Sequence, residues 1–131
     1  MGTTTFSGPV VSQNGFVGDF TGNITGNVTG NVTGDVFASV QSLSGAGAVN
    51  VTDMFTSLTT SGVSQALTLA NGTVGQMKII AHAVDGGSAV LTPTTKIGFT
   101  TTTFTNVGDA ATLIYTAAGW AIVGISGAVA A

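Results

Sequence analysis

The chain of 131 residues contains no cysteine, no glutamate and no arginine. Without cysteine it has neither disulfides nor thiolate metal sites, so cysteine usage gives no indication of its redox compartment. Charged residues make up 5% of the chain, against about 25% in an average soluble domain. Binding to a nucleic-acid backbone depends on clustered basic residues, and two lysines cannot supply them. We therefore expect no nucleic-acid partner.

Long apolar runs and targeting signals are missing as well. No stretch reaches the roughly 18 apolar residues that cross a bilayer, and no basic segment followed by an apolar run stands at the amino terminus. We therefore expect no membrane partner and no secretory signal. The hydrophobic content of 44% is enough for a buried core. A net charge of −3 on so few groups protects poorly against association, which suits a subunit that packs against neighbours.

The most informative segment is residues 21–36, which read TGNI-TGNV-TGNV-TGDV after a looser copy at residues 17–20. A short, regular period indicates one backbone step that is stacked repeatedly. Glycine in every unit argues against a helix, because each would cost about 1 kcal/mol relative to alanine. In an extended chain the glycine and the aliphatic residue share one face, and the threonine and asparagine share the other. We expect another backbone to approach closely at each glycine.

One strand of this kind buries almost nothing by itself. We therefore expect several copies of the chain to wrap around a shared axis, with three the preferred number, since cyclic closure is usual for homo-oligomers. The alternative is a flexible linker, which needs no periodic apolar residue. The predicted trimer interface comprises Phe20, Ile24, Val28, Val32 and Val36, with Trp120 as an anchor of either the core or this interface.

The segments on either side of the repeat differ in character. Residues 1–16 contain Pro9, which cannot donate to a strand ladder, so we interpret them as an edge strand or an arm that lies on a partner. We predict an arm at 1–16, a trimerisation segment at 17–44 and a β domain at 45–131. The residues with which the arm would bind its partner are Phe6, Pro9, Val10 and Phe16.

The carboxy-terminal part contains short strand patterns separated by turn residues. Asn71-Gly72 predicts a hairpin between residues 65–70 and 76–84, and residues 117–119 predict a second one between 111–116 and 120–125. This spacing indicates a small antiparallel β-sandwich or barrel-like domain. The predicted fold is therefore all-β, with the arm and repeat as an intertwined trimeric β stalk.

Candidates for catalysis and metal binding are few. The single histidine, His82, could pair with Asp85 or Asp109, but a hydrogen-bonded histidine within a strand is the interpretation that we favour. Asp19 and Asp35 would form rings around a trimer axis, yet their spacing matches no calcium loop, and aspartates in glycine-rich turns usually bond their own backbone. We expect no enzyme activity, no metal and no cofactor.

Four aromatic residues could line a surface for a carbohydrate or a receptor: Trp120, Tyr115, Phe99 and Phe104. Aromatic rings give much contact area for little loss of conformational entropy. At alternating strand positions of a small β domain they more often form the core, and we favour that role.

Three parts of the sequence together resemble small virion proteins of tailed bacteriophages: the opening TTFSGPVVSQNGF, the TGNV repeats and the closing GDAATLIYTAAGW-AIVG. The closing pattern of Gly108-Asp109, Leu113-Ile114-Tyr115 and Gly119-Trp120 is similar to the end of trimeric phage fibre and decoration domains. The resemblance spans nearly the whole chain. It implies a homotrimer on the outer surface of a phage capsid, held to the major capsid protein by the amino-terminal part.

The resemblance does not separate capsid decoration from receptor binding. We expect a decoration (cement) protein that stabilises the shell by bridging capsomers; the alternative is a head- or tail-fibre protein that binds a host glycan. Five repeat units span at most about 70 Å, which favours decoration over a long fibre. A third class, an ice-binding solenoid, also repeats threonine, but one threonine in four residues forms no broad array within one chain.

Overall fold

The computed structural model describes Ser7 and residues 28–131, and every structural statement below refers to these residues. The chain divides into two compact units, Met1–Gly34 and Asp35–Ala131. The second unit contains the strand Val40–Ser44, which precedes the predicted start of the β domain at residue 45. Apart from Ser7, the predicted arm lies outside the described residues, and so do the repeat positions before Val28.

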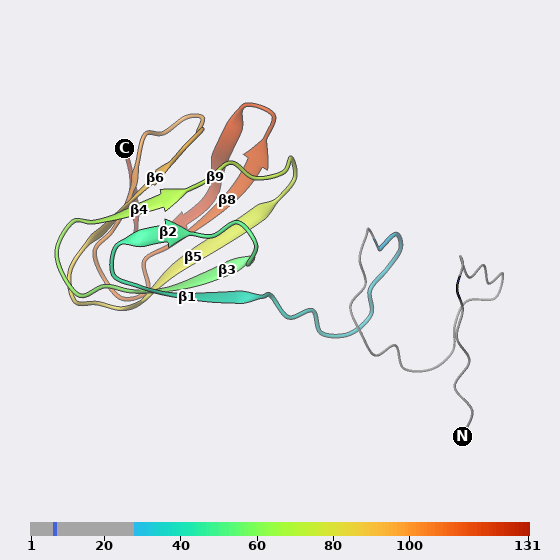
Figure 1. Ribbon diagram of the computed structural model, residues 1–131, viewed down its shortest axis with the longest axis horizontal. Helices are drawn as coiled ribbons and strands as arrows, with labels where there is room; N and C mark the ends of the chain where they lie inside the picture. Colours follow the sequence, from blue (N-terminus) through green and yellow to red (C-terminus); the bar gives the residue numbers. More distant parts are fainter. Residues whose placement is uncertain (1–6, 8–27) are drawn as a thin grey trace, which may run out of the picture. The chain divides into compact units, whose positions relative to one another are not determined.

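All strands of the described chain belong to the second unit. They form two five-stranded sheets, with the orders β1-β3-β5-β8-β9 and β10-β7-β6-β4-β2. Figure 1 shows the first order as a succession from β1 at the bottom of the view to β9 at the top. The strands are β1 (Val40–Ser44), β2 (Gly47–Val49), β3 (Phe55–Thr59), β4 (Gln65–Leu69), β5 (Met77–Val84), β6 (Ala89–Pro93), β7 (Thr102–Phe104), β8 (Ala110–Thr116), β9 (Gly119–Ser126) and β10 (Val129–Ala130).

The all-β prediction is confirmed, and the two sheets form an open sandwich rather than a closed barrel. The prediction of antiparallel sheets is wrong, because both sheets are mixed. The pairs β1–β3, β3–β5, β2–β4 and β4–β6 are parallel, whereas β5–β8, β8–β9, β6–β7 and β7–β10 are antiparallel. The chain changes sheet after each of its first five strands. Because it crosses over and back, it re-enters each sheet in the original direction.

The two predicted hairpins have opposite outcomes. The hairpin between residues 111–116 and 120–125 is confirmed, since β8 and β9 pair antiparallel with Tyr115 opposite Trp120. The hairpin at Asn71-Gly72 is wrong, because β4 and β5 belong to different sheets. Its loop instead packs on the core: a Cβ atom on Gly72 would lie 2.9 Å from the ring of Trp120.

The core fills the space between the two sheets. Strands such as β3 and β6 alternate between buried and less buried residues, as expected where one face of each sheet covers a core. Complete burial of one large aliphatic or aromatic side chain contributes about 1.5–3 kcal/mol. The largest fully buried apolar side chains are Leu58, Leu67, Leu69, Ile80, Leu91, Phe104, Leu113 and Trp120.

The turn at Asp85-Gly-Gly packs against the segment that connects β3 to β4. The hydroxyl of Thr60 accepts a hydrogen bond from Gly86 N at 2.9 Å and donates one to Gly87 O at 2.7 Å. Gly87 has φ +141°, and a Cβ atom there would lie 2.5 Å from the carbonyl group of Gly62. The turn therefore requires glycine both for its conformation and for the close approach of two backbones.

Candidate self-association surface

The described part of the repeat exposes its aliphatic residues at regular intervals. Val28, Val32 and Val36 are 60%, 62% and 74% exposed. We call these three residues the valine row. They are the described members of the predicted trimer interface within the repeat; Phe20 and Ile24 lie outside the described residues. Within one chain, the valine row therefore keeps most of its apolar surface in contact with solvent.

The backbone of the repeat differs from the predicted extended strand. Gly30 and Gly34 have φ angles of +131° and +128°, whereas an extended strand has negative φ. The strict alternation of faces assumed for residues 28–36 is therefore wrong. Among the residues that the structure describes, none has an atom within 4 Å of a Cβ atom built on either glycine. In one chain these glycines are required by the backbone conformation rather than by close approach of a neighbour.

The period of four continues into the sandwich. Val40, the next residue in the series after Val36, is the first residue of β1 and is 57% exposed. The register places it beside Phe55 of β3, which in turn lies beside Ile79 of β5. Phe55 and Ile79 are half-buried. Val40, Phe55 and Ile79 therefore lie side by side across three strands, on the outer face of the first sheet.

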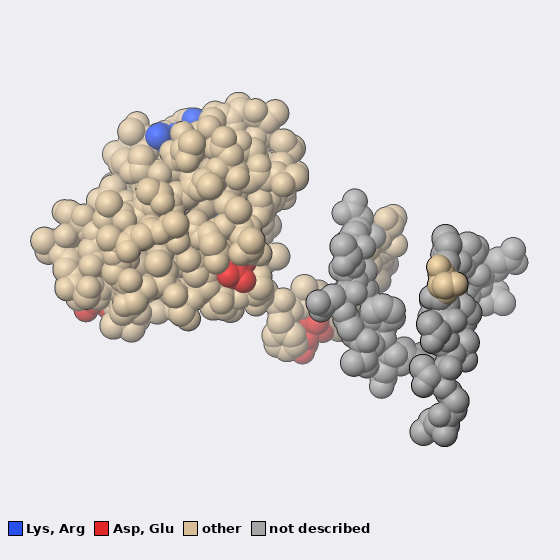
Figure 2. Space-filling model, in the orientation of Figure 1, with Lys and Arg blue, Asp and Glu red and all other residues tan. Residues whose placement is uncertain are grey.

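Charged groups are scarce on the sandwich. Lys78 and Asp109 are buried, and Lys96 donates a hydrogen bond to Pro93 O at 3.1 Å. In the face drawn in Figure 2, the charged atoms lie towards the margins of the sandwich and the broad area between them is uncharged. The described residues contain no group of three potential metal ligands, and they include no helix with the length and apolarity of a bilayer-crossing segment.

Trp120 lies in the core of a single chain. It is fully buried, and its indole Nε1 donates a hydrogen bond to Ala70 O at 2.8 Å. Its backbone joins the loop before β7, since Trp120 N donates to Thr95 O at 2.9 Å. The core alternative for Trp120 is therefore correct, and the residue has no surface left to contact a second chain.

The other three aromatic candidates are not gathered on one surface. Phe104 is fully buried in the core. Tyr115 packs edge-on against Trp120, with the ring centroids 5.1 Å apart and an interplanar angle of 70°. Phe99 is half-buried in the loop between β6 and β7. These four aromatic residues therefore do not form one exposed surface on which a sugar could stack.

His82 lies between the sheets, on the buried face of β5 near the end of that strand. It is 1% exposed, and its Nε2 lies 3.0 Å from the hydroxyl oxygen of Thr60. The same hydroxyl donates to Gly87 O at 2.7 Å, so Thr60 links the imidazole of His82 to the turn after β5. Its Nδ1 atom has no hydrogen-bond partner in the described part of the chain. The side chain is a buried structural link rather than a group open to substrate.

Asp109 holds the turn that leads into β8. Its carboxylate accepts hydrogen bonds from Thr105 N at 2.7 Å and from Asn106 N at 2.9 Å. The bond from Thr105 N is the main cause that lowers the pKa of Asp109 below its ordinary value, against the opposing effect of burial. His82 N also donates to Asp109 O at 2.8 Å, but through the backbone. Asp109 therefore acts on a turn, as expected of an aspartate beside glycine.

A partly buried group of polar residues not recognised from the sequence includes the buried Lys78. Its ammonium donates a hydrogen bond to Asp53 O at 2.7 Å, and burial lowers its pKa from 10.5 to about 8, partly offset by the charge of Asp53. Asn50 Nδ2 donates to the Asp53 carboxylate at 2.7 Å, and Gln41 Oε1 accepts from Asn50 N at 2.9 Å. The one feature of the sequence that could have indicated a buried lysine is the position of Lys78 between two apolar residues in a strand pattern.

Comparison with known proteins gives no relative: neither the scan against models of protein families nor the search of curated proteins found a match. The function must therefore be argued from the chain's own residues.

Proposed function

We propose that this protein is a structural subunit of a phage particle, which assembles as a homotrimer through its repeat and decorates the capsid. One observation carries the proposal: Val28, Val32 and Val36 are more than half exposed at a fixed interval in one chain. An isolated apolar surface residue needs no explanation, but a regular row of them marks an interface. A row that every copy presents in the same way is suited to cyclic association of identical chains.

The proposed mechanism is mechanical. The trimer bridges neighbouring capsomers of the major capsid protein and buries surface that exists only in the assembled shell. A ligand that binds only the assembled state stabilises that state by mass action. The scarcity of charge supports this role, since 5% charged residues leave little for salt to screen. Capsid binding of this kind should persist at high ionic strength.

The amino-terminal arm is the proposed anchor, so its removal tests the proposal. A variant that begins at Thr21 should keep the sandwich folded and lose binding to capsids, measured by co-sedimentation with particles free of the native protein. The full chain is the control. Co-sedimentation of the truncated variant at the level of the full chain would contradict an anchor in the arm.

Imaging of labelled virions distinguishes decoration from attachment. With the protein labelled on intact particles, decoration places the label over the whole head surface. Label confined to a vertex or to the tail would contradict decoration and favour the fibre alternative, in which a host glycan is the partner.

A further inference from the structure

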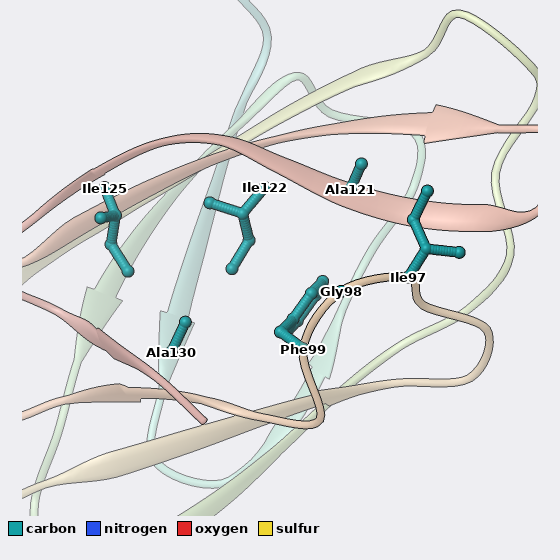
Figure 3. Close-up of a pocket in the computed structure, with 7 residues that line it drawn as sticks. All are labelled: Ile97, Gly98, Phe99, Ala121, Ile122, Ile125 and Ala130. Carbon is teal, nitrogen blue, oxygen red and sulfur yellow. The ribbon is translucent and has the colours of Figure 1, made fainter.

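A pocket opens between the last two strands and the loop that precedes β7. It has a volume of about 320 Å³, and every residue that lines it is apolar or glycine. Figure 3 shows side chains of β9, β10 and the loop pointing into the same space. The larger lining residues are Ile97, Phe99, Ile122 and Ile125, with Ala130 at one side. The volume is at the lower end for ligand sites and suits one bulky apolar group.

A bulky apolar group is exposed elsewhere on the same chain. Phe37 directly follows the last residue of the valine row and is 88% exposed, the highest value among the large hydrophobic residues described. The backbone is fixed two residues later, where Phe55 N donates to Ser39 O at 3.0 Å. Phe37 therefore stands just outside the β1 edge of the sandwich, and no part of the chain that the structure describes covers it.

Phe37 cannot fill the pocket of its own chain. The strand β1 is one edge of the first sheet and β9 is the other, with three strands between them. At a spacing of about 4.8 Å, the two edges lie roughly 19 Å apart. Two residues beyond Ser39 reach at most about 7 Å. The exposed ring of Phe37 and the apolar pocket are thus at opposite edges of the first sheet.

We propose that the pocket binds the ring of Phe37 from a second copy of this chain. A contact between opposite edges is heterologous, and a heterologous contact forms a closed ring of three copies when it rotates each copy by a third of a turn. Each copy then inserts its Phe37 side chain into one neighbour and receives the Phe37 side chain of the other. Neither the aromatic side chain nor the pocket is then exposed to solvent. The inference rests on the proposed homotrimer and extends its interface, because Phe37 continues directly from Val36.

The contact has the character of a binding hot spot. An aromatic side chain that enters an apolar pocket loses nearly all its water contact, and such anchors dominate the energy of many interfaces. The pocket presents no charged group that the ring would have to desolvate. Lys96, next to Ile97 in the sequence, directs its ammonium to Pro93 O.

Substitution of Phe37 tests the proposal on the full chain. The variant Phe37→Ser should raise the concentration at which the trimer dissociates by at least about tenfold, measured by analytical ultracentrifugation over a dilution series. Phe37→Leu, which keeps an apolar group, should recover most of the affinity. Val63→Ser is the matched control, because Val63 is 81% exposed in the turn between β3 and β4 and should leave dissociation unchanged.

Cross-linking tests the placement directly, and the absence of native cysteine makes it specific. Ala38 is adjacent to Phe37, and Ala130 lines the pocket. The double variant Ala38→Cys with Ala130→Cys should form a covalent trimer under mild oxidation. The control pair, Ala38→Cys with Ala66→Cys, should not, because Ala66 is an exposed residue of β4 on the outer face of the other sheet.

The outcomes separate this inference from the proposed function. A wild-type trimer with unchanged dissociation of Phe37→Ser, or with equal cross-linking of both cysteine pairs, overturns the pocket contact and leaves the trimer intact. A wild-type chain that stays monomeric overturns both. A wild-type trimer that Phe37→Ser weakens and that only the first pair cross-links supports both.

Discussion

The sandwich and the valine row use the same kind of residue in opposite ways. In the sandwich, aliphatic residues such as Leu58 and Leu113 are fully buried by the two sheets of one chain. In the valine row, Val32 keeps 62% of its surface exposed although its four-residue spacing is regular. The first set can stabilise a chain by itself, and the second can contribute only when another molecule covers it. The proposed function therefore assigns folding to the sandwich and assembly to the valine row.

This difference predicts that damage to one region should spare the other. A change in the core should lower the stability of the fold, and a change in the valine row should act on assembly. The following predictions test that separation, from the largest expected effect to the smallest.

The largest effect is expected when Val28 and Val32 are both replaced by Asp. In a trimer this buries unpaired carboxylates, each at a cost of about 3–5 kcal/mol, so the oligomer should dissociate into single chains. The sandwich should melt at the same temperature as a wild-type chain diluted below the dissociation point. Light scattering measures the first result and circular dichroism the second. An unchanged trimer mass would refute the shared-axis arrangement.

The converse change lies in the core. Leu58→Ala should lower the free energy of unfolding of the sandwich by about 2–5 kcal/mol, because the side chain is completely buried and leaves a cavity. Denaturant titration measures this loss, and Val107→Ala, at a residue that is 63% exposed, is the control. Equal losses in the two variants would show that the sandwich is not the separately stable part of the molecule.

The smallest effect concerns the pH dependence that Lys78 gives to the sandwich. Its pKa is about 8 in the folded chain and returns to its ordinary 10.5 on unfolding. Between these values the unfolded chain binds more protons, so stability should rise with pH from about 8 to 10.5. Below pH 8 the contribution is constant. Lys78→Met removes the titrating group.

The difference in the free energy of unfolding between wild type and Lys78→Met separates the contribution of Lys78 from that of other titrating groups. Denaturant titrations of both proteins at a series of pH values should give a difference that is flat below pH 8 and increases in favour of the wild type above it. A difference that does not change between pH 8 and 10.5 would mean that the ammonium is not desolvated in the folded chain.

The sequence predicts local features better than the course of the chain. The hairpin of β8 and β9 is predictable because its turn and its paired strands are contiguous. The error at Asn71-Gly72 arises because a turn signal does not specify which sheet receives the next strand. The strand β1 was missed because three of its five residues are exposed, two of them serine, and its parallel pairing with β3 depends on residues fifteen positions away.

The candidate surface was predictable in part for the same reason. The regular interval of Val28, Val32 and Val36 is a sequence pattern, and all three are exposed because no other described segment of the chain packs on them. The role of Trp120 could not be decided, since both core and interface favour a large aromatic residue. The pocket beside Phe99 joins three segments that only the tertiary structure brings together.

The most direct test is the mass of the wild-type chain in solution, measured by sedimentation equilibrium at high protein concentration. If the valine row is covered only by identical copies, the mass should be three times the 12.8 kDa of one chain. A mass of one chain at every concentration, together with narrow nuclear magnetic resonance signals from the methyl groups of Val28, Val32 and Val36, would contradict the account.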